Sequence, residues 1–385
     1  MNKLIVLLSE TVLFALLILF LIAESVSITI LFIVAGFLCA AAVLIFPKKA
    51  ERIIKPFAKE RRTAIIFSMI LMAILPFFFT TQPYWLLTLS LAGIYIMLAN
   101  GLNMQTGTTG LTNFSGAAFF GTGAYTTGLL SVHLGLPGWL TIPAGMFASV
   151  LIGAILFFPV LKVKGHYLAL VTIAFGLMFN IMLNNTDAIG GPQGISGVKA
   201  FAIGGFDFSG MWAIGPFIFS SYANNYWLTL LAAILALAFT RYIYNSPVGL
   251  ILNYVRDDEW SSKSQGLNIS YWKLIAFCCG NALIGLGGAL YAHMIGYVAP
   301  DLFSFQTSLL LLSMVLLGGM DSIPGVTVAA FVMIVLTEKL RVIQDYRFLI
   351  FGLLVIIMII FRKEGLIPSR VRPYFPKLKS VLMKR

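Results

Sequence analysis

The stretches LLTLSLAGIYIML at residues 86–98 and FLIFGLLVIIMIIF at residues 348–361 contain no charged residue and are almost wholly apolar. A strand of a membrane barrel would instead alternate apolar and polar side chains. A backbone inside hydrocarbon must have all its hydrogen bonds satisfied within the protein, which leaves only helices or closed barrels. The two runs therefore predict an all-α fold, a polytopic bundle of transmembrane helices.

The composition of the whole chain supports the same fold class. Hydrophobic residues make up 59% of the 385 residues, charged residues make up 10%, and the mean hydropathy is +0.96. An ordinary soluble domain has about 25% charged residues. A soluble domain of this length could not cover so much apolar surface, so we expect lipid to be the main solvent.

Apolar runs of about 20 residues mark segments long enough to cross a bilayer. We expect ten to twelve spans, because three of the twelve candidates are short and residues 113–134 are rich in glycine, which is compatible with a re-entrant segment or a half-helix. The candidate spans are 4–22, 27–46, 63–81, 84–104, 113–134, 139–163, 166–184, 223–244, 273–297, 305–319, 325–338 and 347–361.

The basic residues predict the orientation, because short loops rich in lysine and arginine remain in the cytoplasm. With both termini cytoplasmic, 22 of the 26 basic residues fall on the cytoplasmic side. Residues 245–272 are then cytoplasmic and residues 185–222 are exterior. The net charge of +12 thus reports topology and contact with anionic membrane lipid, and no nucleic-acid partner is needed.

The apolar runs and the basic segments together predict three parts of the chain. Residues 1–62 would form two N-terminal spans and a basic cytoplasmic loop, residues 63–365 the main transmembrane domain, and residues 366–385 a basic cytoplasmic tail.

The cytoplasmic connection predicts two short helices. Ser246 followed by Pro247 is typical of a helix N-cap and first position. A second helix should begin near Asp258 and stop at Gly266, because glycine is the usual residue just after a helix end. The charged cluster between the two helices is Arg256, Asp257, Asp258 and Glu259. Its compactness favours a surface for a partner over a solvated loop without a special role.

A second feature is the polar, glycine-rich region from residue 99 to residue 130. It holds seven glycines together with the amides Asn100, Asn103, Gln105 and Asn113. Amides are costly in a membrane segment unless they pair with other helices or line a hydrated path. Close helix packing and a translocation path therefore both remain open. The spacing of Gly288, Ala292 and Gly296 more clearly predicts a helix contact.

Other chemistry finds little support in the sequence. The three histidines are far apart and the cysteines have no CxxC spacing, so we expect no metal site and no cofactor. A stand-alone secondary carrier often has paired carboxylates in its spans, and a membrane enzyme would need clustered catalytic side chains. Neither pattern occurs. The ATP-binding pattern GxxxxGK[ST] is also missing, so ATP-driven transport would need a separate ATPase polypeptide.

Four stretches resemble the permeases of branched-chain amino acid ABC transporters of the LivM type. They are LANGLNMQTGTTGLTNFSGAAFFGTGAYTTGLL at 98–130, KGHYLALVTIAFGLMFNIMLNNTDAIGGPQGI at 164–195, SPVGLILNYVRDDEWSSKSQGLNISYWKLIAF at 246–277 and LLGGMDSIPGVTVAA at 316–330. They occur in the order found in that family and cover about residues 85–365.

The resemblance implies a subunit of a bacterial inner-membrane importer that is not itself an enzyme. Its implied partners are a second permease subunit, two cytoplasmic ATPase subunits and a periplasmic solute-binding protein. Carried over by position, the loop that docks into the ATPase would contain Arg256, Asp257, Asp258, Glu259 and Gly266. The residues near the translocation path would be Asn100, Asn103 and Asn113.

The chain departs from the family pattern at several positions. Ser261 and Ser262 stand where small alanines are usual, Trp260 is bulky, and Asp321 replaces a typical glycine. These departures leave the implied fold intact and leave the solute and the ATPase partner open. Branched-chain or related amino acids are the first expectation for the solute. Urea or a short-chain amide is the alternative, and an ion-coupled carrier is a weaker one.

Overall fold

The computed structural model describes most of the chain between residues 60 and 339. The described residues are 2–23, 60–80, 82–160, 166–203, 206–214, 217–339, 341, 352–353, 356, 360 and 365–367. Span 27–46, most of span 347–361 and most of the C-terminal tail lie outside these residues. The predictions for those segments therefore stay predictions.

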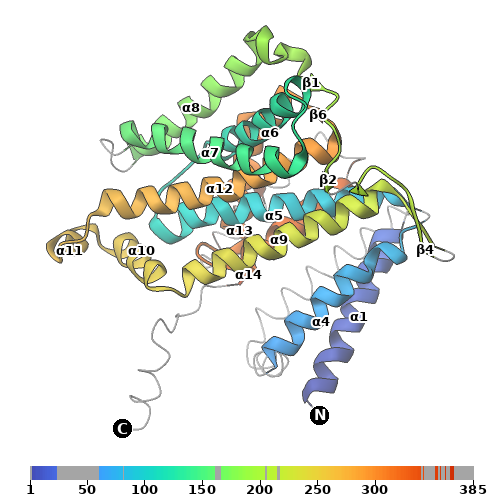
Figure 1. Ribbon diagram of the computed structural model, residues 1–385. Helices are drawn as coiled ribbons and strands as arrows, with labels where there is room; N and C mark the ends of the chain where they lie inside the picture. The colour runs from blue at the N-terminus through green and yellow to red at the C-terminus, as the bar shows by residue number, and fades with distance from the viewer. Residues whose placement is uncertain are drawn as a thin grey trace. The chain divides into compact units, whose positions relative to one another are not determined.

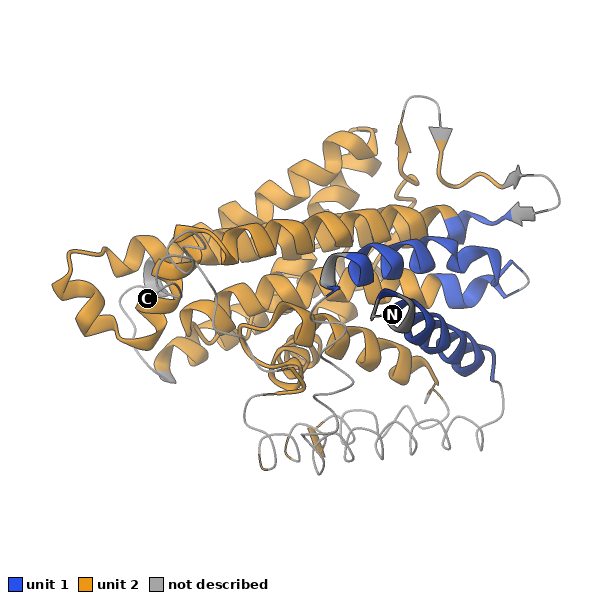
Figure 2. Cartoon of the chain, turned by 90° about the horizontal axis from the view of Figure 1, so that it is seen from below, with its two compact units in different colours: residues 1–86, 212–223 blue, residues 87–211, 224–385 orange. Residues whose placement is uncertain are grey.

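Two compact units share the chain (Figure 2). The smaller comprises residues 1–86 and 212–223, and the larger comprises residues 87–211 and 224–385. The smaller unit contains α1 (Asn2–Ile22), α4 (Arg61–Ile74), η1 (Leu75–Phe77), β4 (Trp212–Ile214) and β5 (Phe217–Phe219). Within it α1 packs against α4, and Phe14 meets Phe78 edge to face. Every residue predicted to carry function lies in the larger unit.

The long helices belong mainly to the larger unit, and α5 and α9 begin in the smaller one. The helices are α5 (Pro83–Thr109), α6 (Gly116–His133), α7 (Gly138–Val160), α8 (His166–Asn185), α9 (Ser221–Tyr244), α10 (Pro247–Asp257), α11 (Glu259–Ser264), α12 (Ile269–Ile295), α13 (Phe305–Gly318) and α14 (Ile323–Lys339). Short 3-10 turns occur at η2 (Asp187–Ile189), η3 (Gly191–Gln193) and η4 (Pro300–Phe303).

The all-α, polytopic fold class is confirmed. By length and composition, five helices among the described residues can cross a membrane: Pro83–Thr109, Gly138–Phe157, Tyr167–Asn185, Ser221–Tyr244 and Ile269–Ile295. Shorter apolar helices accompany them, and α13 and α14 have 14 and 17 residues. At 1.5 Å per residue neither reaches the roughly 30 Å of a hydrocarbon core, as the sequence suggested for these two spans.

Helices α5, α6 and α12 are among those that differ from the predicted spans. Helix α5 continues to Thr109, beyond the predicted end at residue 104, because polar residues in its last turns bond to neighbouring elements. Most of the glycine-rich segment 113–134 forms one unbroken helix, α6, which begins at Gly116 and ends at His133. Helix α12 begins early, since the side chain of Asn268 accepts a hydrogen bond from the backbone N–H of Tyr271.

Helices α6, α7 and α12 pack against one another in the larger unit, and glycines permit the close approach. A Cβ on Gly123 would lie 2.8 Å from the Cα of Gly285, and one on Gly145 would lie 2.7 Å from the carbonyl oxygen of Gly123. A Cβ on Gly288 would lie 2.8 Å from the backbone N of Ala124, which confirms the predicted helix contact there. Gly296 has another role: with φ +74° it ends α12.

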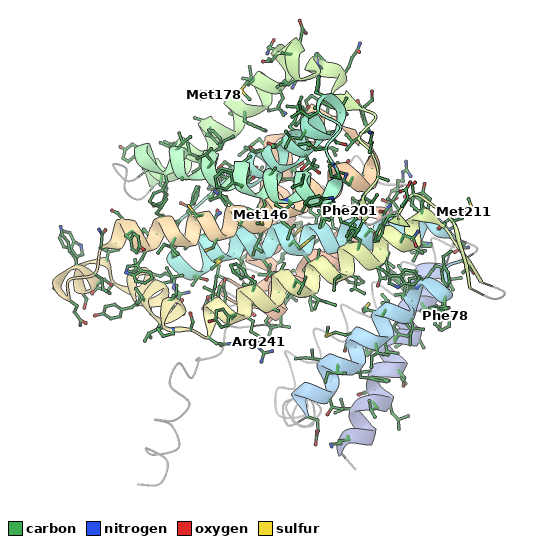
Figure 3. The ribbon with its side chains drawn as sticks, in the orientation of Figure 1. Phe78, Met146, Met178, Phe201, Met211 and Arg241 are labelled. Carbon is green, nitrogen blue, oxygen red and sulfur yellow. The ribbon has the colours of Figure 1, made fainter. Side chains whose placement is uncertain are left out.

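The connections of the larger unit gather at two opposite ends of its long helices (Figure 1). Helices α10 and α11 lie at one end, and β1 (Ile195–Ser196), β2 (Ala202–Ile203) and β6 (Tyr297–Val298) lie at the other. Figure 3 shows Arg241 on the last turn of α9, just before the connection to α10. The placement of residues 185–222 and 245–272 on opposite faces of a membrane stays a prediction.

The glycine-rich connection between α8 and α9 contains short strands that were not predicted from the sequence. β1 pairs with β6, so Ile195 faces Val298 across the ladder. β2 pairs with β3 (Phe206–Asp207), and β4 pairs with β5. Each strand has only two or three residues, which is too short for an alternating pattern to show in the sequence.

Candidate functional site

Helices α10 and α11 form at the positions that the sequence predicted. Ser246 is the N-cap of α10 and Pro247 is its first residue. The carboxylate of Asp258 accepts hydrogen bonds from the backbone N–H groups of Trp260 and Ser261, at 2.9 and 3.1 Å, and so caps α11. Gly266 has φ +81°, a conformation that favours glycine just beyond a helix end. The predicted pair of short helices is therefore confirmed.

Side-chain contacts fix α11 against its neighbours. The hydroxyl of Ser262 is buried and donates to the carbonyl of Asp258 at 2.8 Å and to that of Tyr254 at 3.2 Å. Lys273 of α12 forms an ion pair with Glu259. The small Ser262 thus stands where the resemblance leads one to expect alanine, and its hydroxyl ties the two short helices together.

The outer surface of this helix pair carries an aromatic side chain beside carboxylates. Trp260 is 77% exposed, and the carboxylate-bearing side chain of Asp257 is 69% exposed. The acidic cluster is therefore not a single site: Glu259 pairs with α12, Asp258 caps α11, and Asp257 lies at the surface. What remains accessible is a rigid, aromatic and acidic surface, which we call the α10–α11 surface (residues 256–266).

Arg256 of the predicted cluster contacts α5 and the α13–α14 turn. Its Nη1 donates a 2.7 Å hydrogen bond to the carbonyl oxygen of Gly107, in the last turn of α5. The same atom lies 3.8 Å from a carboxylate oxygen of Asp321, and Nε lies 3.2 Å from Asp257. The last carbonyls of a helix lack partners within the helix, so Arg256 supplies a donor at the end of α5.

Asp321 occupies the turn between α13 and α14 and has φ +65°. This left-handed conformation explains why the family pattern has glycine at this position. In this chain the carboxylate of Asp321 is buried and accepts a 3.0 Å hydrogen bond from the hydroxyl of Thr108. Its backbone N–H donates to the side chain of Asn103 at 2.8 Å. The turn is therefore attached to α5 through both backbone and side chain.

The same corner receives the end of the predicted main transmembrane domain. The backbone N–H of Leu366 donates to the carbonyl of Leu317 at 2.9 Å, and that of Ile367 donates to Gly318 at 3.3 Å. Gly365 has φ +81°, and a Cβ there would overlap Gly319. The described part of the tail thus lies at the α10–α11 end, where the predicted cytoplasmic tail is expected.

A buried network of amides joins α5 to α12 and to the start of α6. Gln105 donates to the carbonyl of Phe277 at 3.1 Å and to the side chain of Asn281 at 2.7 Å. Gln105 in turn accepts a 2.6 Å bond from Asn113. The oxygen of Asn113 accepts hydrogen bonds from the backbone and hydroxyl of Ser115, which is the N-cap of α6. Gln105 is therefore the centre of this network.

The three asparagines predicted to lie near a path are all buried within the subunit. Asn100 donates to Thr327 of α14 at 3.2 Å, Asn103 bonds to Asp321, and Asn113 bonds to Gln105. Each links α5 or its following turn to another element, so their contacts favour packing of helices. One polar atom each of Asn100 and Asn103 has no hydrogen-bond partner among the described residues.

The opposite end of the larger unit is held by a buried histidine. His293 lies 2.7 Å from the carbonyl oxygen of Lys199 through Nδ1 and 2.7 Å from the hydroxyl of Thr141 through Nε2. The ring of Phe201, which Figure 3 labels, meets the imidazole edge to face. The backbone N–H of Lys199 also bonds to Ser131 at 3.2 Å. His293 of α12 thus attaches the connection between α8 and α9 to α7.

Three asparagines near the end of α8 donate side-chain hydrogen bonds to backbone carbonyls. Asn184 and Asn185 donate to carbonyls one turn earlier, at 2.9 and 2.8 Å. Asn180 instead reaches the carbonyl of Pro300 at 3.0 Å, outside α8. Asn184 and Asn185 therefore bond within α8, and Asn180 links α8 to η4.

Two features of these networks were not predicted from the sequence: the role of Asn281 and the contact between Arg256 and Asp321. Asn281 was not singled out, although it is an amide inside a predicted span beside a glycine, and polar residues in spans usually have a partner. The contact between Arg256 and Asp321 was also missed, because two charges so far apart in the sequence give no local signal. Cys278 and Cys279 are half-buried on α12.

The described helices define a multi-pass, all-α membrane protein. A family model described as "Branched-chain amino acid transport system / permease component" matches residues 84–360. The chain belongs to this family. No solved structure matches the chain.

Relatives of the same kind match most of the chain. The high-affinity branched-chain amino acid transport system permease protein LivM of Salmonella typhimurium is 37% identical over 300 residues, which cover 74% of this chain and 70% of that protein. Its counterpart LivM of Escherichia coli strain K12 is 34% identical and covers 83% and 78%. The permease protein LivH of Salmonella typhimurium is 23% identical and covers 63% and 80%.

Proposed function

We propose that this chain is a permease subunit of an ABC importer for branched-chain amino acids in a bacterial inner membrane. The observation that carries the proposal is the family match over residues 84–360, which includes α10, α11 and the α13–α14 turn. The two LivM relatives, at 37% and 34% identity, are named for branched-chain amino acid transport. Their names support the same class of solute for this chain.

The implied complex contains a second permease subunit, two cytoplasmic ATPase subunits and a periplasmic solute-binding protein. The LivH relative supports a partner permease, because LivM and LivH are both named as permeases of a high-affinity branched-chain amino acid system. The chain itself has no GxxxxGK[ST] pattern for ATP. In this proposal the ATPase subunits hydrolyse ATP and this subunit forms half of the path.

The α10–α11 surface is the part of the larger unit best suited to receive the ATPase. It is rigid, because Asp258, Ser262 and Lys273 hold its backbone and helices in place. A preorganised surface loses less conformational freedom on binding. Trp260 is an exposed aromatic at its centre, and tryptophan is among the residues that contribute most to protein interfaces.

A pair of tryptophan substitutions tests this placement. We expect Trp260→Ala to weaken the retention of ATPase subunits on the purified permease by about tenfold or more, as truncation of a central interface aromatic does. Trp139→Ala is the matched control, since Trp139 is also exposed (55%) but begins α7 at the opposite end of the larger unit. The measurement is the amount of ATPase co-purified, titrated with added ATPase.

Equal retention by wild type and Trp260→Ala would contradict the placement of the ATPase at this surface. The solute is tested separately with the binding protein, by competition of labelled leucine against valine and urea. Displacement by valine and not by urea is the expected result.

A further inference from the structure

A contact chain runs from the α10–α11 surface into the bundle. Arg256 lies in the last turn of α10, one residue from the Asp257–Asp258 connection that leads to α11. Its guanidinium contacts Gly107 of α5 and approaches Asp321 of the α13–α14 turn. A displacement of the two short helices would therefore carry this guanidinium with it.

The guanidinium of Arg256 binds where the backbone of α5 and the α13–α14 turn are closely packed. The carbonyl of Gly107 belongs to the last turn of α5, and the 2.7 Å bond from Arg256 is short, as bonds from charged donors usually are. A Cβ on Gly107 would lie 2.5 Å from the backbone N of Asp321, so the turn packs directly on the backbone of α5. The side chain of Asn103, which accepts from that same N–H, lies in this contact as well.

Asp321 is held from three directions. Thr108 donates to its carboxylate, Asn103 accepts from its backbone N–H, and Arg256 faces the other carboxylate oxygen. A residue other than glycine in the left-handed region persists when its surroundings compensate for the strain. A glycine here would fit the backbone without strain but would offer no carboxylate. The aspartate therefore adds a charged contact for Arg256 that glycine cannot provide.

We propose that Arg256 and Asp321 form a strut that transmits movement of the α10–α11 surface to α5 and to the α13–α14 turn. The role rests on the proposed function, in which ATPase subunits displace that surface. Arg256 and Asp321 are positioning residues: they touch neither solute nor ATP and act through the helices that they join. The strut links α5, which carries the amide network, to the two shorter helices α13 and α14.

The first test measures the mechanical link in the purified permease complex. Arg256→Gln and Asp321→Asn each remove one charge; asparagine still tolerates the left-handed conformation and can still accept from Thr108. We expect backbone amide hydrogen exchange to rise about fivefold in residues 103–109 and 318–322 in both variants. A rise in exchange confined to residues 254–266 would overturn the strut, because loss of the Arg256–Asp321 contact would then leave α5 and the α13–α14 turn unchanged.

The second test measures solute imported per ATP hydrolysed in reconstituted vesicles. We expect each single variant to lower this ratio about fivefold, and the double variant to be no worse than either single one. Glu338→Gln is the control. It removes the ion pair between Glu338, near the end of α14, and the exposed Arg341, and it should leave the ratio unchanged. Independent, multiplied effects in the double variant, or an unchanged ratio in both singles, would overturn the strut.

The two tests separate the strut from the proposed function. If the wild-type complex shows no ATP-driven import, the proposed function fails, and the exchange measurement alone decides whether the strut exists. If the wild-type complex imports solute and the single variants behave like it in both tests, the strut fails and the proposed function stands.

Discussion

Substitution of Gly123 by alanine is expected to cost about 3 kcal/mol of folding stability, because an added methyl group would overlap the backbone of α12. A Cβ at this position would lie 2.8 Å from the Cα of Gly285 and 2.9 Å from its carbonyl carbon. Backbone atoms inside a packed helix cannot rotate away as the tip of a side chain can. Helices α6 and α12 would have to separate, and α7 would lose its contact with both.

Gly128 supplies a matched control in the same helix. A Cβ there would meet side-chain atoms of Ile195 and Val198 at 3.5 to 3.7 Å, which is ordinary van der Waals contact. Gly128→Ala is expected to be neutral or to stabilise the helix by up to about 1 kcal/mol, since alanine favours helix more than glycine does. Thermal unfolding of the purified protein in detergent measures both. Equal midpoints for the two variants would contradict the close packing of α6 on α12.

The second large effect concerns Gln105. Replacement by methionine, which has a similar length and no polar amide, should cost about 3 kcal/mol because it leaves buried polar groups of Asn113 and Asn281 without their partner. The measurement is the free energy of unfolding in detergent. Thr240→Val is the control, since the hydroxyl of Thr240 is buried but bonds only within its own helix, to Ala236 at 2.9 Å.

A follow-up variant tests whether the amides act as one network. In the double variant Gln105→Met, Asn281→Leu, the orphaned oxygen of Asn281 is removed, so the second change should cost much less than it does alone. Simple addition of the two single costs would show that Gln105 and Asn281 do not depend on each other. The explanation of the long α5 helix by interhelical amide contacts would then be wrong.

Local features of the fold could be predicted from the sequence because their causes are local. Ser246 followed by Pro247 gives the start of α10, and the Asp258 carboxylate and Gly266 set the limits of α11. Each depends on residues at the helix end itself: proline at the first position of α10, the Asp258 carboxylate on nearby N–H groups, and glycine in the left-handed conformation. The apolar runs likewise predicted the long helices, because length and hydropathy alone decide whether a helix can cross a bilayer.

Features that depend on distant contacts could not be predicted. The spacing of Gly288 and Ala292 predicted a packed face but not that α6 would be its partner. The acidic cluster was predicted as one surface, yet its members divide between a helix cap, an ion pair to Lys273 and the protein surface. The polar asparagines of α5 suited either a path or packing, and only their interhelical bonds favour packing in this subunit.

The structure explains why aspartate can replace the typical glycine at residue 321. The sequence marks only that an aspartate stands where glycine is typical. The φ of +65° explains the usual glycine, and the contacts with Thr108, Asn103 and Arg256 explain how an aspartate is tolerated. The same contacts define the proposed strut, which no local pattern predicts.

The most direct test of the central claim is uptake of labelled leucine into vesicles reconstituted with this chain, its partner permease, the ATPase subunits and the binding protein. We predict accumulation only when ATP, the ATPase subunits and the binding protein are all present, with no dependence on an ion gradient. Accumulation by this chain without nucleotide, driven by a proton or sodium gradient, would contradict the account.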